Sequence, residues 1–133
     1  MPTVSTFQSL LLVACGGALG AVMRALLAIA ATQLHMKAVF ATLAANVIGC
    51  LAAGFLLGAT KWASEPQHSL RFLIMVGVLG GLTTFSAFSV ETVTLVKQGE
   101  NYAAFGNVAA NLCLGFGAVW LGLSVGGMFS RNS

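Results

Sequence analysis

Residues 77–89 combine glycines with hydroxyl side chains in the middle of an apolar stretch. The segment reads Gly-Val-Leu-Gly-Gly-Leu-Thr-Thr-Phe-Ser-Ala-Phe-Ser, and its hydroxyl residues are Thr83, Thr84, Ser86 and Ser89. Adjacent glycines weaken a helix, and hydroxyl side chains compete for its backbone groups. The free carbonyls of an interrupted helix can bind a cation, whereas the N–H groups that open the next helix favour an anion. The segment therefore predicts an ion site.

Two phenylalanines lie inside this hydroxyl cluster. Phe85 and Phe88 are three positions apart, so they share a helix face beside Ser89 and Thr92 if the helix resumes there. A phenylalanine pair at this spacing is usually part of a core or of a lipid-facing surface. The edge of an aromatic ring carries partial positive charge, however, and can contact a small anion. Both interpretations stay open at this point.

Five further polar residues stand within apolar stretches, where each is costly and is therefore a site candidate: Arg24, Asn46, Glu91, Asn107 and Asn111. Asn107 and Asn111 are four positions apart and form a stripe on one helix face. Hydrogen bonding between helices is the alternative role for the asparagines. Glu91 must be partnered, face water or be protonated. Arg24 offers it the opposite charge, although we expect this Arg to extend to the membrane surface.

Four long apolar stretches must position these residues. Of 133 residues, 58% are hydrophobic and 7% are charged, whereas about 25% are charged in a soluble domain. Each stretch reaches the roughly 20 residues that cross a hydrocarbon core, and none alternates as barrel strands do. The stretches run near 7–31, 39–60, 71–96 and 103–128. We expect an all-α integral membrane protein, one domain over 1–133 with four transmembrane helices, the third of them broken.

Basic residues are distributed evenly between the two sides of the membrane. One side carries Lys61, Arg71 and Arg131, and the other carries Lys37 and Lys97, with Arg24 near it. The bias that normally fixes orientation is therefore almost absent. Insertion in both orientations, with pairing through a two-fold interface, predicts an antiparallel homodimer. Orientation set by a partner or by the insertion machinery is the alternative. Six Lys and Arg are too few to indicate a nucleic-acid surface.

Glycines recur at four-residue spacing in every span, a pattern through which membrane helices approach closely. The pairs are Gly16 with Gly20, Gly54 with Gly58, Gly77 with Gly81, and Gly122 with Gly126. We expect most glycines only to pack helices. Gly80 and Gly81 are the exceptions, because we assign them to the break in the third helix.

Four segments together make the sequence similar to the fluoride channel family (Fluc, also called CrcB). They are 16–24, Asn46-Val-Ile-Gly49, 80–91 and Asn111-Leu-Cys-Leu-Gly115. The third is specific, and the likeness covers nearly the whole chain. The resemblance implies a fluoride-selective channel and no enzyme activity. It also implies a dual-topology antiparallel homodimer with two pores in a bacterial inner membrane, exporting fluoride from the cytoplasm by passive conduction.

The resemblance also implies roles for individual residues of the fluoride path. The ring edges of Phe85 and Phe88 would contact fluoride, Asn46 would line the pore as a donor, and Glu91 would lie near the central vestibule. The further candidates along the path are Thr84, Ser86, Ser89 and Asn111.

A structural sodium ion is the cofactor that the resemblance implies. The backbone carbonyls of Gly80 and Thr83 would bind it at the dimer interface, and Arg24 would have a structural role. The implied partners are fluoride, sodium, a second copy of the chain and membrane lipid.

Two other functions remain as alternatives. Proton-coupled exporters of the small multidrug resistance type also have four helices, but they use a carboxylate in the first helix, where this chain has Arg24 and no acid. A membrane assembly subunit without transport activity would leave the polar break over 80–89 without a role. No nucleophile and base combination indicates an enzyme.

Overall fold

The computed structural model describes residues 5–60 and 68–131, and every regular element within them is helical. Four helical spans are long and apolar enough to cross a membrane. They are Thr6–Gln33 (α1), Ala38–Ala59 (α2), the composite span Ser69–Lys97, and Asn101–Ser130, which belongs to α6 (Asn101–Arg131). The expected multi-pass, all-α membrane architecture is confirmed. Lys61, one of the loop charges counted above, lies outside the described residues.

The composite third span consists of several short elements. Its parts are α3 (Ser69–Arg71), the π-helix η2 (Phe72–Leu79), α4 (Gly80–Leu82) and α5 (Phe85–Lys97). Between α4 and α5, Thr83 (φ −78°, ψ 151°) and Thr84 (φ −152°, ψ 119°) have extended backbone. The Thr83 N–H still bonds to the Leu79 carbonyl at 3.0 Å, the last helical bond before the interruption, and the helix resumes at Phe85.

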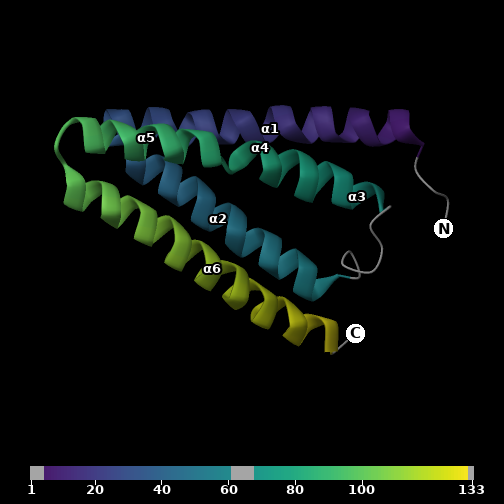
Figure 1. Ribbon diagram of the computed structural model, residues 1–133. Coiled ribbons are helices and arrows are strands. Elements are labelled where there is room, and N and C mark those ends of the chain that lie inside the picture. Colours follow the sequence, from purple (N-terminus) through teal and green to yellow (C-terminus); the bar gives the residue numbers. More distant parts are fainter. Residues whose placement is uncertain (1–4, 61–67, 132–133) are drawn as a thin grey trace.

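Successive spans run in opposite directions, so the start of α1 and the end of α6 lie at the same end of the molecule (Figure 1). The opposite end carries the turn between α1 and α2 and the turn between α5 and α6. Gly99, in the second turn, has a φ of 77°. Glycine adopts this left-handed conformation more easily than other residues, and it is common just after a helix C-terminus. The Lys37 ammonium contacts the Glu100 carboxylate at 2.6 Å. This ion pair links the two turns.

Glycines hold the helices together in two closely packed pairs. Where α1 meets the third span, a methyl group built on Gly16 would lie 3.0 Å from the Cα of Gly77. Where α2 meets α6, a methyl on Gly54 would lie 3.0 Å from the Cα of Val119, and one on Gly126 would lie 2.8 Å from the Ala59 nitrogen. These approaches confirm the packing role of the glycine pairs.

Gly81 corrects one expectation. A methyl on Gly81 would lie 3.1 Å from the Cα of Gly17 and from the Ala21 nitrogen on α1. Gly81 is also helical, because α4 continues to Leu82. Gly80 and Gly81 both belong to α4, so their assignment to the break is wrong, since the extended backbone begins at Thr83.

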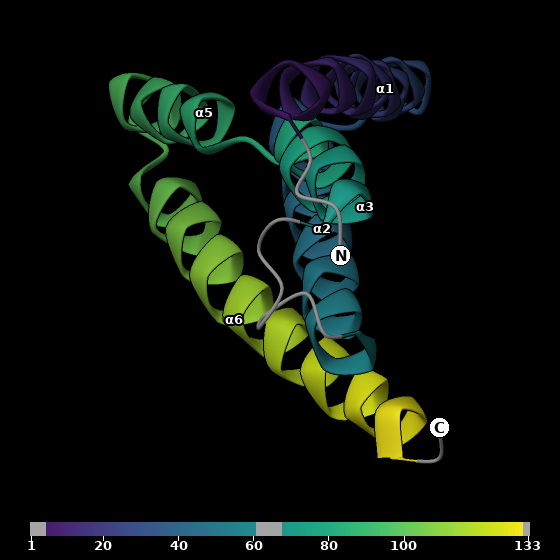
Figure 2. The same cartoon turned by 90° about the vertical axis from the view of Figure 1, so that its right-hand side faces the viewer.

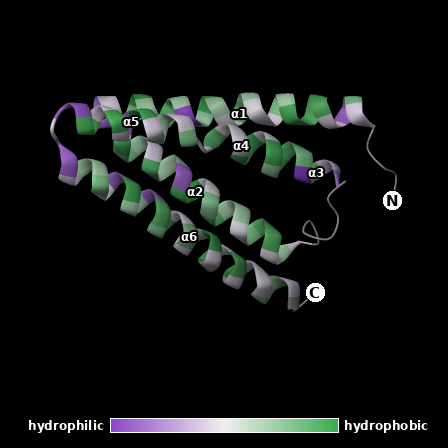
Figure 3. Ribbon diagram, in the orientation of Figure 1, coloured by the Kyte–Doolittle hydropathy of each residue, from purple (hydrophilic) through white to green (hydrophobic). Residues whose placement is uncertain are grey.

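Large apolar side chains cover the outside of the spans, and few side chains are fully buried. Ala45 and Leu82 are the most enclosed, at 0% and 2% exposed. Figure 3 shows hydrophobic residues along all four spans and hydrophilic residues gathered at the turns and at a few positions within the helices. In Figure 2, α5 stands to one side of α1, and α6 begins beneath α5 and approaches α2 toward the C-terminus. Lipid or another protein surface must cover the exposed apolar side chains.

Candidate functional site

Asn46 on α2 binds both backbone groups of Thr84 in the break. Its Oδ1 accepts a hydrogen bond from the Thr84 N–H at 2.8 Å, and its Nδ2 donates to the Thr84 carbonyl at 3.3 Å. The same Nδ2 donates to Oδ1 of Asn111 on α6 at 2.9 Å. One side chain thus satisfies backbone groups that the extended conformation withdraws from the helix, and it ties three spans together.

A chain of polar side chains continues from Asn111 toward the turn end of α6. The Asn111 Nδ2 donates to Oδ1 of Asn107 at 3.1 Å, and the Asn107 Nδ2 donates to Oγ1 of Thr92 on α5 at 2.9 Å. The Thr92 hydroxyl donates to the Phe88 carbonyl at 2.8 Å. The hydrogen bonds between helices that we considered for the asparagines are therefore present, and they form one connected network.

The hydroxyl residues around the break have distinct local partners. Thr84 is 8% exposed, and its Oγ1 accepts the Ala87 N–H at 3.2 Å, which caps α5. The Thr84 and Ser86 hydroxyls lie 3.1 Å apart. Ser89 donates to the Phe85 carbonyl at 2.8 Å, one turn back along α5. Thr84 and Ser86 thus belong to one polar cluster, whereas Ser89 bonds within its own helix.

Phe85 and Phe88 contact each other but differ in exposure. Their ring centroids are 5.5 Å apart and their planes are tilted by 56°. Phe88 is 9% exposed, whereas Phe85 is 78% exposed. The ring of Phe85 therefore lies on the outer surface of the chain, directly after the polar break.

The carbonyls of Gly80 and Thr83 are released from ordinary helical bonding. In a continuous helix, the Thr84 N–H would bond to the Gly80 carbonyl and the Ala87 N–H to the Thr83 carbonyl. Here Asn46 takes the first N–H and the Thr84 hydroxyl takes the second. Backbone carbonyls freed in this way are suitable oxygen ligands for a small cation.

Glu91 is bonded to a hydroxyl and not to Arg24. Its Oε1 accepts from Oγ1 of Thr42 on α2 at 2.6 Å. Its Oε2 is buried without a hydrogen-bond partner among residues 5–60 and 68–131. The suggestion that Arg24 pairs with Glu91 is therefore wrong, since rotation of α1 and α5 does not bring the two charges together. The sequence had not singled out Thr42.

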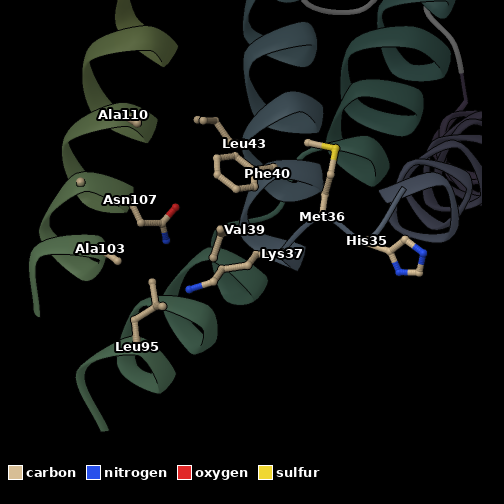
Figure 4. Close-up of a pocket in the computed structure, with 11 residues that line it drawn as sticks. His35, Met36, Lys37, Val39, Phe40, Leu43, Leu95, Ala103, Asn107 and Ala110 are labelled. Carbon is tan, nitrogen blue, oxygen red and sulfur yellow. The ribbon is translucent and has the colours of Figure 1, made fainter. Parts of the chain in front are cut away.

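Two neighbouring cavities open at the end of the molecule that carries the two turns. The larger, of about 580 Å³, lies between α2, α5 and α6, and Lys37 and Asn107 contribute to its lining (Figure 4). The smaller, of about 330 Å³, is lined by Glu91, Glu100 and Lys37 among others. Asn107 belongs both to the lining of the larger cavity and to the asparagine network, so hydrogen-bonded side chains connect this cavity to the break.

Comparison with known proteins identifies the family. The chain matches the family described as CrcB-like protein, Camphor Resistance (CrcB), over residues 11–123. The chain belongs to the CrcB family. It is 44% identical over 125 residues to the "Fluoride-specific ion channel FluC" of Shewanella woodyi, covering 93% of this chain and 98% of that relative. The protein of the same name from Dehalococcoides mccartyi is 38% identical over 128 residues, covering 93% and 96%.

The family match spans all the candidate residues. Everything from Arg24 to Asn111, including the break and its asparagine partners, lies within residues 11–123. The CrcB match does not favour the multidrug exporter, and α1 offers no acidic residue over Thr6–Gln33 to serve such a mechanism. The candidate residues that meet at the break, Asn46, Thr84 and Asn111, are neutral hydrogen-bonding groups within the membrane spans.

Proposed function

We propose that this chain is a fluoride-specific ion channel and not an enzyme. One observation carries the proposal: relatives named as fluoride-specific ion channels match 93% of this chain at 38–44% identity. The polar break at Thr83 and Thr84, held at membrane depth by Asn46, gives such a channel a place where an ion can leave water.

The groups around the break suit a small, strongly hydrated anion. Fluoride must exchange its water for other donors, and these must bind it weakly enough for it to leave. The Ser86 hydroxyl and the positive ring edges of Phe85 and Phe88 would provide such donors, and the Asn46 amide would do so by exchanging its bond to the Thr84 carbonyl or to Asn111 Oδ1 for the ion. Lys and Arg are absent from 72–96, so no full positive charge in this part of the span would trap the ion.

A second copy of the chain would complete the site. Phe85 and Ser86 are exposed on the outside of a membrane span, where a hydroxyl facing lipid is unfavourable. An isologous partner that covers this surface would supply the other wall of the pore. The even distribution of loop charges supports an antiparallel, dual-topology dimer of this kind.

The same surface would suit a sodium ion. Gly80 is exposed on the outer face of the third span, and its carbonyl and that of Thr83 are freed from helical bonding. Carbonyls from two copies would hold the ion between the breaks. Bound sodium would offset the repulsion between these carbonyl dipoles and lock the two copies together. Helical spans, as opposed to a barrel, support a location in the bacterial inner membrane.

Fluoride efflux from liposomes tests the proposal. Purified protein should release fluoride rapidly, read with a fluoride electrode, while chloride is retained. Phe85→Ile should abolish this efflux, because it removes the ring edge at the break. Phe105→Ile is the matched control, since Phe105 is similarly exposed (74%) on α6, and it should leave efflux unchanged. No fluoride release from folded wild-type protein would reject the channel and favour the assembly subunit.

The dimer has its own test. A reporter that functions on only one side of the membrane, fused to the C-terminus, should be active in about half of the copies if the chain inserts both ways. A uniform sidedness would reject the antiparallel dimer while leaving the liposome result untouched.

A further inference from the structure

Lys37 lies where the two cavities meet. It belongs to the lining of both the larger and the smaller cavity. In Figure 4, the ammonium of Lys37 and the amide of Asn107 point into the same space between α2 and α6. The cationic group thus stands at the outer end of the route that leads through Asn107 and Asn111 to the break.

The surroundings strengthen the field of this charge. Among the described residues that line the larger cavity, Lys37 is the permanently charged one, His35 and Asn107 are the other polar ones, and the rest are apolar. Apolar walls have a low dielectric constant, and a charged cleft with such walls raises the local concentration of the opposite ion. A positive charge here therefore favours the entry of an anion.

Glu100 opposes this field. Its carboxylate contacts the Lys37 ammonium at 2.6 Å, and the two side chains are 41% and 60% exposed, respectively. An ion pair this exposed contributes little to folding stability. Its greater effect is on the electrostatic potential at the cavity mouth. The carboxylate makes this potential less positive, and removing the carboxylate makes it more positive.

We propose that Lys37 collects anions at the mouth of the larger cavity and that Glu100 tunes the strength of this attraction. The inference rests on the proposed channel function and adds to it a rate-determining group outside the break. Because the Lys37 side chain is exposed to water, a fluoride ion that it attracts keeps much of its hydration and can leave. Lys37 therefore concentrates fluoride without binding it tightly. Asn107 is then the first neutral donor that the ion meets.

Substitutions at both positions, assayed at two ionic strengths in uncharged lipid, test the proposal. Because the Debye length falls from about 30 Å at 0.01 M salt to about 8 Å at 0.15 M, steering by Lys37 must weaken as salt is added. Lys37→Gln should slow initial fluoride efflux about three- to tenfold at 0.01 M and less than about twofold at 0.3 M. Glu100→Gln should accelerate it about two- to threefold at 0.01 M.

Two further variants separate attraction from a structural tie between the turns. Lys97→Gln removes an equal charge at the same end of the molecule from a residue that lines neither cavity, so it should slow efflux at 0.01 M salt less than Lys37→Gln does. The double exchange Lys37→Glu with Glu100→Lys restores an ion pair but places a carboxylate at the cavity. Efflux should stay slow in the double exchange if Lys37 collects anions.

The outcomes are distinct. Recovery of wild-type efflux in the double exchange, or a loss in Lys37→Gln that is equal at both salt concentrations, would overturn the inference. If Lys37→Gln released fluoride as fast as the wild-type protein at both salt concentrations, the inference would also be overturned, but the channel function would stand. A wild-type protein that releases no fluoride would instead reject the channel itself, and the inference with it.

Discussion

Replacing Asn46 by Leu is the most direct perturbation of the break. Leu has a similar volume but no hydrogen-bonding group, so the N–H and carbonyl of Thr84 both lose their partner. Thr84 is 8% exposed, and each buried polar group left unpaired costs about 1–3 kcal/mol. Two such groups give about 2–6 kcal/mol. The lost bond to Asn111 adds about 0.6 kcal/mol, a typical value within membranes.

Unfolding in mixed micelles by increasing amounts of sodium dodecyl sulfate, followed by tryptophan fluorescence at fixed protein concentration, measures this loss. Asn107→Leu is the matched control, because it breaks the side-chain bonds to Thr92 and Asn111 but leaves no backbone group unpaired. It should cost only about 1 kcal/mol. Fluoride efflux should fall at least about tenfold in Asn46→Leu, since a local stability loss of 1.4 kcal/mol already changes an equilibrium tenfold.

An Asn46→Leu protein that unfolds within about 1 kcal/mol of wild type would refute this reasoning. It would mean that the Thr84 backbone finds water or another partner, so that Asn46 does not hold the break. A large stability loss with unchanged efflux would contradict only the link between the break and conduction.

Three further substitutions test the helix packing at Gly126, the hydrogen bond to Glu91 and the turn at Gly99. Gly126→Ala should destabilise the protein by about 1–3 kcal/mol through overpacking against α2, whereas the adjacent Gly127→Ala, which meets no atom within 4 Å, should not; equal unfolding midpoints would contradict the close packing. Thr42→Val should cost about 1–3 kcal/mol by removing the hydrogen bond to Glu91, and Thr42→Ser should restore it; failure of Ser to rescue would point to packing instead. Gly99→Ala should cost about 1 kcal/mol because its φ is 77°, and an unchanged unfolding curve would argue against the left-handed turn.

Properties that depend on the local order of residues were readable from the sequence. Membrane crossing depends on the apolar residues within about 20 positions, so all four spans were predicted, with ends that differ from the structure by a few residues. The polar residues Asn46, Asn107 and Asn111 stood out because lipid makes each of them costly. The glycine spacing likewise predicted close approach, which requires only that a helix face lacks side chains.

Contacts between residues far apart in the chain were decided by the tertiary structure. Asn46 reaches the backbone of Thr84, 38 positions away, and Glu91 reaches Thr42, 49 positions away. The rotation of each helix about its axis selects these partners, and an almost uniformly apolar helix gives no sequence signal for that rotation. This is why Arg24 was a reasonable partner for Glu91 by charge and the wrong one by geometry.

The same reason explains the details of the third span. The sequence located a weak helix at 77–89, but which residues leave the helix depends on where partners exist for the released backbone groups. Asn46 meets them at Thr84, while Gly81 stays helical because α1 packs against it. The contact of Lys37 with Glu100 at the cavity mouth likewise depends on how the helices pack. Residue type and spacing thus determined the membrane spans and the chemistry available within them, whereas helix packing chose the partners that give each group its role.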